Sequence, residues 1–239
     1  VYRTWMHLWP TPAALADAPS GEAVRAWGRL GYPRRALRLH AAATAIVERH
    51  GGEVPGDHAA LRALPGVGDY TAAAVASFGF GQRHAVLDTN VRRVLARAVS
   101  GVALPAVSVT RAERAVAESL VPDQRPARWA VAVMELGALV CTAARPRCDR
   151  CPIAAACAWR AAGRPPHDGP PRKVQRYAGT DRQCRGALLA VLRGAEGAVA
   201  ATELEAAWPD AVQRARALTG LLDDGLVVEQ PGQGYALPG

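Results

Sequence analysis

The sequence Leu64-Pro65-Gly66-Val67-Gly68 joins two segments of helical character. HAALRAL, residues 58–64, is expected to form a short helix that ends at Pro65, and DYTAAAVASFGFG to begin a second helix near Asp69. Two closely spaced glycines permit a tight turn and leave no Cβ in the way of another backbone. The amides that open the second helix favour a phosphate oxygen. The pattern predicts a helix-hairpin-helix that binds nucleic-acid backbone; the alternative is an ordinary inter-helix turn.

The amino-acid composition is typical of a protein that binds a polyanion. The 239 residues carry a formal net charge of +8, and Lys173 is the only lysine, so the positive charge is almost entirely arginine. A basic chain gains affinity for nucleic acid by releasing counterions from phosphates, although a codon bias towards arginine gives the same composition. No apolar run approaches the ~20 residues of a membrane span, and the first residues lack the zones of a signal peptide. A cytoplasmic location is therefore expected.

Outward from the hairpin, the chain is predicted to be all-α in its main body. Residues 11–50 and the segments 110–120 and 126–140 have helical character, and NVRRVLARAV spaces its apolar residues as an amphipathic helix does. Residues 161–183 are rich in Pro, Gly and charge and are expected to be a linker. The remainder predicts three helices and a hairpin, a small winged-helix-like unit. The expected domains are 1–83 with the hairpin, 84–160 with a cysteine loop, the linker, and 184–239.

Four of the five cysteines fall within seventeen residues, and their spacing predicts a metal site. They are Cys141, Cys148, Cys151 and Cys157, while Cys184 stands apart. Such clustering in a chain without an export signal indicates metal binding rather than disulfides. Zinc is one candidate, but zinc ribbons usually use two separated C-x2-C pairs and only one is present. The irregular spacing and the Cys-Pro step suit a [4Fe–4S] cluster better.

Asp88 is the third candidate functional feature. It precedes the amphipathic helix in Val86-Leu87-Asp88-Thr89-Asn90-Val91, so its default role is that of a helix N-cap. An aspartate at that position also stays ionised beside the positive end of the helix dipole.

These three motifs, in this order, resemble the helix-hairpin-helix DNA glycosylase superfamily, and the adenine DNA glycosylase (MutY) family within it, in a short actinobacterial-like form. The resemblance covers roughly residues 1–160. It implies a six-helix domain plus an iron–sulfur helical domain, base excision repair, and a [4Fe–4S] cluster on the four cysteines. It also implies that Asp88 is catalytic, with Tyr70 and Asn90 positioning it and the substrate. Tyr70 stands where the endonuclease III-like lyases of the superfamily carry their nucleophilic lysine.

The resemblance further implies the ligand and its contacts. A MutY-like enzyme removes adenine opposite 8-oxoguanine or guanine in double-stranded DNA, without strand cleavage, and is expected to act as a monomer. Backbone contacts are expected at Leu64, Gly66, Val67 and Gly68. Tyr32 matches a tyrosine that the family inserts into the base stack, and Arg34 beside it is expected to contact DNA. The alternative for Tyr32 is a buried aromatic at a helix end.

The chain departs from the family pattern in two places. The glutamate that protonates adenine in the family lies in an E-x-M-L-Q-Q-T-like helix, and residues 1–239 contain no such segment. The expectation is therefore an N-terminally truncated chain, through fragmentation, a misassigned start or decay, with little activity of its own. The Nudix-like domain that recognises 8-oxoguanine in the family also has no counterpart of sufficient length. The remaining alternatives are an endonuclease III-like lyase and a non-catalytic, cluster-bearing DNA-binding protein.

Overall fold

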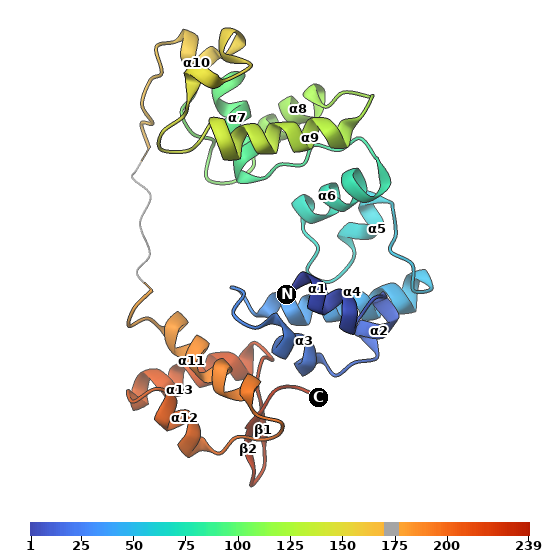
Figure 1. The fold of residues 1–239 in the computed structure, drawn as a ribbon, viewed down its shortest axis with the longest axis vertical. Helices are drawn as coiled ribbons and strands as arrows, with labels where there is room; N and C mark the ends of the chain where they lie inside the picture. Colours follow the sequence, from blue (N-terminus) through green and yellow to red (C-terminus); the bar gives the residue numbers. More distant parts are fainter. Residues whose placement is uncertain (170–176) are drawn as a thin grey trace. The chain divides into compact units, whose positions relative to one another are not determined.

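The computed structural model of the chain describes residues 1–169 and 177–239, and it is mostly helical (Figure 1). The expectation of an all-α body is confirmed. The α-helices are α1 Tyr2–Leu8, α2 Pro12–Ala16, α3 Ser20–Trp27, α4 Arg34–His50, α5 His58–Arg62, α6 Asp69–Phe80, α7 Thr89–Ala98, α8 Arg111–Leu120, α9 Pro126–Glu135, α10 Ala158–Ala161, α11 Asp181–Gly194, α12 Ala201–Ala207 and α13 Ala211–Asp223. Shorter turns are η1 Leu136–Val140, which is π-helical, and the 3₁₀ turns η2 Cys148–Arg150 and η3 Ala154–Ala156. In the described ranges, no helix is both long and apolar enough to cross a membrane.

Local chemistry explains where the helices of the site begin and end. The Asp57 side chain caps α5 by accepting the Ala60 amide at 2.8 Å, and Thr110 caps α8 in the same way through the Glu113 amide. Helix α6 ends at Gly81, whose φ of 68° is the left-handed conformation that glycine adopts without strain. The expected helix over 126–140 forms, but its last turn is the π-helical η1, which runs directly into Cys141.

The described chain divides into two compact units. Unit 1 comprises Val1–Pro55, Leu64–Gly66 and the C-terminal part of the chain, and unit 2 comprises Gly56–Ala63 and the segment that starts at Val67 and contains the cysteine loop. The division expected from the sequence, into three domains and a linker, stays a prediction. Its linker, 161–183, includes residues 170–176 and hence Lys173, which lie outside the described residues.

Unit 1 builds one hydrophobic core from the two ends of the chain. Val24 and Ala43 of the N-terminal helices pack in the same cluster as Leu188, Leu221 and Leu226 of the C-terminal segment. Hydrogen bonds reinforce this contact, for the Arg193 Nε donates to the Val24 carbonyl at 2.9 Å. Because residues of both segments bury apolar surface in one cluster, the shared core stabilises both.

The C-terminal segment has the three helices and the hairpin expected of it. Strands β1, Val228–Gln230, and β2, Gly234–Ala236, pair antiparallel with Glu229 opposite Tyr235. Tyr235 also pairs with Val199 through two backbone hydrogen bonds of 2.7 and 2.9 Å, which adds a third short strand-like segment.

Unit 2 packs α7 against α8, α9 and α10. Its core contains Val91 and Leu95 of α7 with Ala117 and Val121 from the α8 region. The Arg92–Glu113 pair ties α7 to α8 with two contacts of 2.6 and 2.8 Å. A bidentate pair of this kind has a fixed geometry, so α7 is held firmly in its orientation. Helix α7 matters because it carries most of the candidate site.

Candidate nucleic-acid interface and catalytic site

The two hairpin glycines have different structural roles. Gly66 has a φ of 75°, and a Cβ at this position would lie 2.6 Å from the Cβ of Arg38. Gly68 has an extended backbone, φ −90° and ψ 175°, and a Cβ there would meet nothing within 4 Å. Gly66 is therefore required by the turn itself, whereas Gly68 leaves the start of α6 open. Leu64 is 5% exposed and anchors the turn in the core, and Val67 is half-buried.

Helix α6 begins at Asp69 with no side chain capping its first amides. Uncapped amides at a helix start are donors that suit a phosphate oxygen. Asp69 itself bonds two arginines, Arg62 at 2.7 Å and Arg114 at 2.7 Å, and both of these side chains remain partly exposed. This pair of arginines was not predicted from the sequence, because Arg114 is 45 residues away from Asp69 along the chain.

The Asp88 carboxylate caps α7, and its hydrogen bonds also hold it in a fixed orientation. One oxygen accepts the Val91 amide at 2.6 Å and so caps α7, and the other accepts the Asn90 Nδ2 at 3.2 Å. The N-cap prediction is confirmed. The carboxylate is half-buried and held by two donors, so its orientation is fixed before any ligand arrives.

Tyr70 lies in the first turn of α6 and is 45% exposed. Within the part of the chain that the structure describes, no hydrogen bond joins Tyr70 to Asp88 or Asn90. The catalytic roles of Asp88, Asn90 and Tyr70 therefore stay predictions, with contact observed for the first two only.

Arg93 extends this arrangement towards the cysteine loop. It is 8% exposed, and it donates to the Asn90 Oδ1 at 2.8 Å, the Gly137 carbonyl at 2.6 Å and the Cys141 carbonyl at 2.7 Å. Gly137 permits this close approach, because a Cβ there would lie 2.7 Å from the Cβ of Asn90. A continuous hydrogen-bonded chain thus runs from Asp88 through Asn90 and Arg93 to the first residue of the cysteine motif.

The four cysteines line one pocket together with Arg97 and Trp159. Arg97 is 3% exposed and donates to the Cys141 Sγ at 3.4 Å and to the Thr142 carbonyl at 2.8 Å. Its guanidinium also lies 4.7 Å from the centre of the Trp159 ring. Such a cation beside sulfur stabilises thiolates, the form that binds metal.

Burial is the main cause that raises the pKa of the Cys151 thiol. A backbone hydrogen bond at Ile153 lowers this pKa, and the neighbouring thiols raise it further. Within the described ranges, no group of three or more His, Cys, Asp or Glu side chains is arranged so that it could hold a metal ion. The four thiols are nevertheless close enough for the other three to affect the Cys151 thiol.

Sequence reasoning missed Arg93 and Arg97, yet a signal was present. Asn90, Arg93 and Arg97 follow one another at i, i+3 and i+7 and so share one face of α7. Charged residues on the buried face of an amphipathic helix are rarely left without partners. Both arginines are buried, so they donate hydrogen bonds to carbonyls of the segment that packs against α7.

Tyr32 and Arg34 belong to unit 1 and lie just before and at the start of α4. Tyr32 is 72% exposed, which excludes the alternative of a buried aromatic. Its φ of 56° is left-handed, a conformation that costs a residue with a Cβ about 1 kcal/mol or more. Arg34 forms an ion pair of 3.2 Å with Asp224. Their contacts with DNA stay predictions.

Comparison with known proteins agrees with these features. Residues 1–116 match the family described as HhH-GPD superfamily base excision DNA repair protein. The adenine DNA glycosylase of Mycobacterium tuberculosis H37Rv is 53% identical over 241 residues, covering all of this chain and 79% of its own length. That of Mycolicibacterium smegmatis is 49% identical, with 100% and 81% covered. The human adenine DNA glycosylase is 43% identical over 161 residues, which cover 66% of this chain and 30% of its own.

Solved structures give the same fold. A thermostable thymine-DNA glycosylase aligns with a TM-score of 0.62 and 28% identity, over 67% of this chain and 75% of its own. A trapped endonuclease III–DNA covalent intermediate aligns with a TM-score of 0.59 at 24% identity, over 68% and 75%, a likeness of fold alone. The motifs in the sequence, the helical fold and relatives matched along the whole chain lead to one conclusion: this chain belongs to the adenine DNA glycosylases of the helix-hairpin-helix superfamily.

Proposed function

We propose that this enzyme removes adenine mispaired with 8-oxoguanine or guanine in double-stranded DNA, as a monomer, by hydrolysis of the N-glycosidic bond without strand cleavage. The observation that carries the proposal is the Asp88 carboxylate, fixed by the Val91 amide and the Asn90 side chain at the start of α7. Relatives named adenine DNA glycosylase, similar along the whole chain, support adenine as the base.

The chemistry follows from the carboxylate. Breaking the bond to adenine leaves positive charge on the sugar, and an ionised Asp88 stabilises that charge in the transition state. In the overall reaction one water molecule supplies the hydroxyl that replaces the base on the sugar and the proton that the departing adenine takes up. The base must first leave the stack, which costs a few kcal/mol that contacts with the protein offset. The Asn90 Nδ2 donates to one Asp88 oxygen and fixes its direction. Arg93 donates to the Asn90 Oδ1 and so holds the Asn90 side chain in place. Positioning of this kind lowers the barrier because no reorganisation is needed during the reaction.

A lyase mechanism has no support from the residues near Asp88. Schiff-base chemistry needs an amine nucleophile, and the position that carries it in the lyases is Tyr70 here. The single lysine of the chain, Lys173, lies outside the described residues. Hydrolysis by water, with Asp88 as the stabilising anion, needs no such amine.

We propose that the hairpin holds the DNA backbone through the first amides of α6. Gly68 supports this, because the space above its Cα is open to an approaching phosphate. Arg62 and Arg114, held by Asp69, add positive charge at the same helix start. Such contacts position the duplex without reading its sequence.

We propose that Cys141, Cys148, Cys151 and Cys157 hold a [4Fe–4S] cluster. The donor set fits: four thiols line one pocket, beside the buried Arg97 cation. A tetrahedral zinc needs all four sulfurs at ~2.3 Å from one point, whereas a cluster binds each sulfur to a different iron and so accepts wider spacing. The irregular spacing of the four cysteines, with a single C-x2-C pair, favours the cluster over a zinc ribbon. When bound, such a group cross-links the loop that carries Arg145, Arg147 and Arg150.

Absorption spectroscopy with iron and sulfide analysis tests the cofactor. A brown protein with about four irons and four sulfides per chain is expected. A colourless protein with one zinc per chain would contradict the proposal. Cys184, which is buried in the core of unit 1, serves as a control, since Cys184→Ala must leave the metal content unchanged.

A single-turnover assay on the full-length gene product tests the activity. Duplexes with A:8-oxoguanine, A:G and A:T pairs are compared. Release of adenine from the first two, with strand breakage appearing only after alkali, is expected. A product trapped by borohydride would identify a lyase. Tight binding of the mispaired duplexes without any excision would identify a non-catalytic protein.

A further inference from the structure

A tryptophan just beyond the last cysteine of the motif is held by three separate contacts. Trp159 lies in α10, shortly after Cys157, and is 8% exposed. Its Nε1 donates to the Pro165 carbonyl at 2.8 Å, and its own carbonyl accepts the Arg164 amide at 2.8 Å. The Arg97 guanidinium lies 4.7 Å from the centre of its ring. These contacts do not involve the candidate catalytic residues.

Trp159 forms the aromatic wall of the pocket that the four cysteines line. Each of those cysteines is only half-buried. A cofactor on partly exposed ligands is lost when water, oxidants or chelators reach it, and the apolar shell beside the ligands controls that access. Trp159 therefore lies where its removal would open the pocket to solvent.

Arg97 connects Trp159 to both ends of the cysteine motif. It donates to the Cys141 Sγ at 3.4 Å and to the Thr142 carbonyl at 2.8 Å. At the other end of the motif, the Cys157 Sγ lies 3.6 Å from the Arg97 carbonyl oxygen. A guanidinium is a rigid planar fork, so donors directed at fixed acceptors leave it one orientation. The Trp159 ring, which lies against this group, is fixed with it.

The chain after the motif is folded back onto Trp159. Arg164 has a φ of 61°, a left-handed conformation that is unfavourable for a residue with a Cβ. The hydrogen bonds that Arg164 and Pro165 form with Trp159 hold the chain in this conformation. The contact between Arg97 and the ring is strengthened by burial, because both partners are removed from water.

We propose that Trp159 is a latch that retains the [4Fe–4S] cluster, with Arg97 as its support. Trp159 closes one side of the cysteine pocket and so slows loss of the cluster. Arg97 holds the ring and the Cys141 sulfur in place before any cluster binds. The inference rests on the proposed cofactor, since it names the residues that retain it. It gives Trp159 no part in base excision.

The test follows the loss of the cluster from the purified holoprotein. The visible absorption is recorded over time in air and, separately, without oxygen in the presence of an iron chelator. Trp159→Ala is expected to lose the cluster about ten- to a hundredfold faster than the wild type in both conditions. Trp159→Phe keeps a ring beside Arg97 but removes the bond to Pro165, and it is expected to lose the cluster at an intermediate rate.

The reduction potential of the bound cluster tests the support by Arg97, because hydrogen bonds and charge at the sulfurs set it. Arg97→Gln removes a cation that donates to the Cys141 Sγ, so the potential is expected to fall. Arg97→Lys keeps the charge and is expected to restore most of the potential. It is not expected to restore retention, because an ammonium group lacks the planar fork that binds the carbonyls and the ring. A general loss of stability would not separate these two effects.

Trp27 in unit 1 is the matched control for Trp159. Its Nε1 donates to the Gly31 carbonyl at 3.2 Å, and the Arg35 guanidinium lies 5.8 Å from the centre of its ring. Trp27 does not line the cysteine pocket. Trp27→Phe must therefore leave the rate of cluster loss unchanged.

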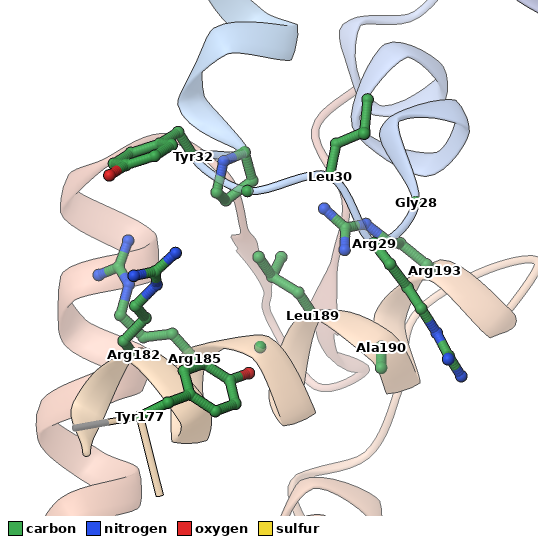
Figure 2. Close-up of a pocket in the computed structure, with 13 residues that line it drawn as sticks. Gly28, Arg29, Leu30, Tyr32, Tyr177, Arg182, Arg185, Leu189, Ala190 and Arg193 are labelled. Atoms are coloured by element: carbon green, nitrogen blue, oxygen red, sulfur yellow. The ribbon is translucent and has the colours of Figure 1, made fainter. Parts of the chain in front are cut away.

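Arg182 is the matched control for Arg97. Its guanidinium lies 5.5 Å from the centre of the Tyr32 ring in unit 1 (Figure 2), and it does not line the cysteine pocket. Arg182→Gln thus removes an arginine from an aromatic ring without changing the sulfurs. The reduction potential and the rate of cluster loss must both stay at their wild-type values.

The outcomes distinguish the latch from the proposed cofactor. A folded Trp159→Ala protein that keeps its cluster as long as the wild type overturns the latch and leaves the cofactor in place. If the wild type contains no iron and sulfide, the cofactor proposal fails and the latch fails with it. Circular dichroism checks the fold of each variant. If Trp159→Ala does not fold, Trp159→Phe decides, and a loss rate equal to that of Trp27→Phe overturns the latch.

Discussion

At the scale of single residues, the candidate site is a half-buried carboxylate that hydrogen bonds hold in a fixed orientation. Asp88 is held by a backbone amide and by Asn90, and Asn90 is held in turn by Arg93. The hydrogen bonds that support Asp88 extend through Arg93 to the Cys141 carbonyl. A change at a support is therefore expected to affect the reaction as well as stability.

Asp88→Asn is expected to slow adenine excision by about 10²–10³-fold, because the charge that stabilises the sugar cation is lost. Asparagine is as good an N-cap as aspartate, so α7 and DNA affinity are expected to be preserved. Single-turnover kinetics and thermal unfolding measure the two effects. Asp210→Asn, a change at the N-cap of α13, is the matched control and must not alter the rate. A normal rate in Asp88→Asn would remove Asp88 from the mechanism.

Arg93→Gln is expected to lower both stability and rate. The Gly137 and Cys141 carbonyls lose a charged donor, at a cost of roughly 1–3 kcal/mol for each buried group left unpaired. Asn90 loses its support, and misplacement of Asp88 is expected to slow excision by about ten- to a hundredfold in the folded protein. Arg128→Gln, on the exposed side of α9, is the control. A purely structural role would lower the unfolding temperature and leave the single-turnover rate unchanged.

At the scale of elements, the hairpin between α5 and α6 combines two requirements in five residues. Gly66 satisfies the geometry of the turn, and Gly68 leaves the helix start uncovered. These requirements are separable by substitution, because only one of the two glycines has a left-handed backbone.

Gly66→Ala is expected to destabilise the protein by at least about 1–2 kcal/mol, because its φ of 75° is strained for alanine and the new methyl would meet Arg38. Gly68→Ala is expected to change stability by less than about 0.5 kcal/mol and still weaken DNA binding, because the methyl occupies the space of the phosphate. Chemical denaturation and binding titrations check both. Gly79→Ala, a change within α6 with open surroundings, is the control. Unimpaired binding by Gly68→Ala would show that the backbone passes elsewhere.

At the scale of the whole molecule, the chain joins its two ends in unit 1 and places the hairpin helices and the cysteine loop in unit 2. The C-terminal segment shares its core with α2–α4 rather than forming a core of its own. The turn that carries Tyr32 is therefore built on the same core as α11.

Leu221→Ala tests this shared core. Leu221 is completely buried, and its truncation is expected to cost about 2–5 kcal/mol. Because the core is continuous, hydrogen exchange is expected to accelerate in α3 and α4 as well as in α13. Leu95→Ala, in the core of unit 2, is the matched change and is expected to leave exchange in α3 unaltered. Acceleration confined to α11–α13 would show that the C-terminal segment is a separate folding unit.

The sequence by itself determined the helical class, the hairpin, the Asp88 cap and the cysteine motif. Each depends on local chemistry: a glycine turn, a capping oxygen, an apolar repeat or the spacing of thiols along a short loop. It also identified the family, because three such motifs occur in a fixed order.

Only the tertiary structure decided what supports these groups. Arg93 and Arg97 reach carbonyls more than forty residues away, and Arg114 reaches Asp69 across a similar separation. Tyr32 and residues of α11, far apart in the sequence, line one pocket. Long-range pairings of this kind are set by the packing of amphipathic helices into a common core, which fixes partners that no local pattern encodes.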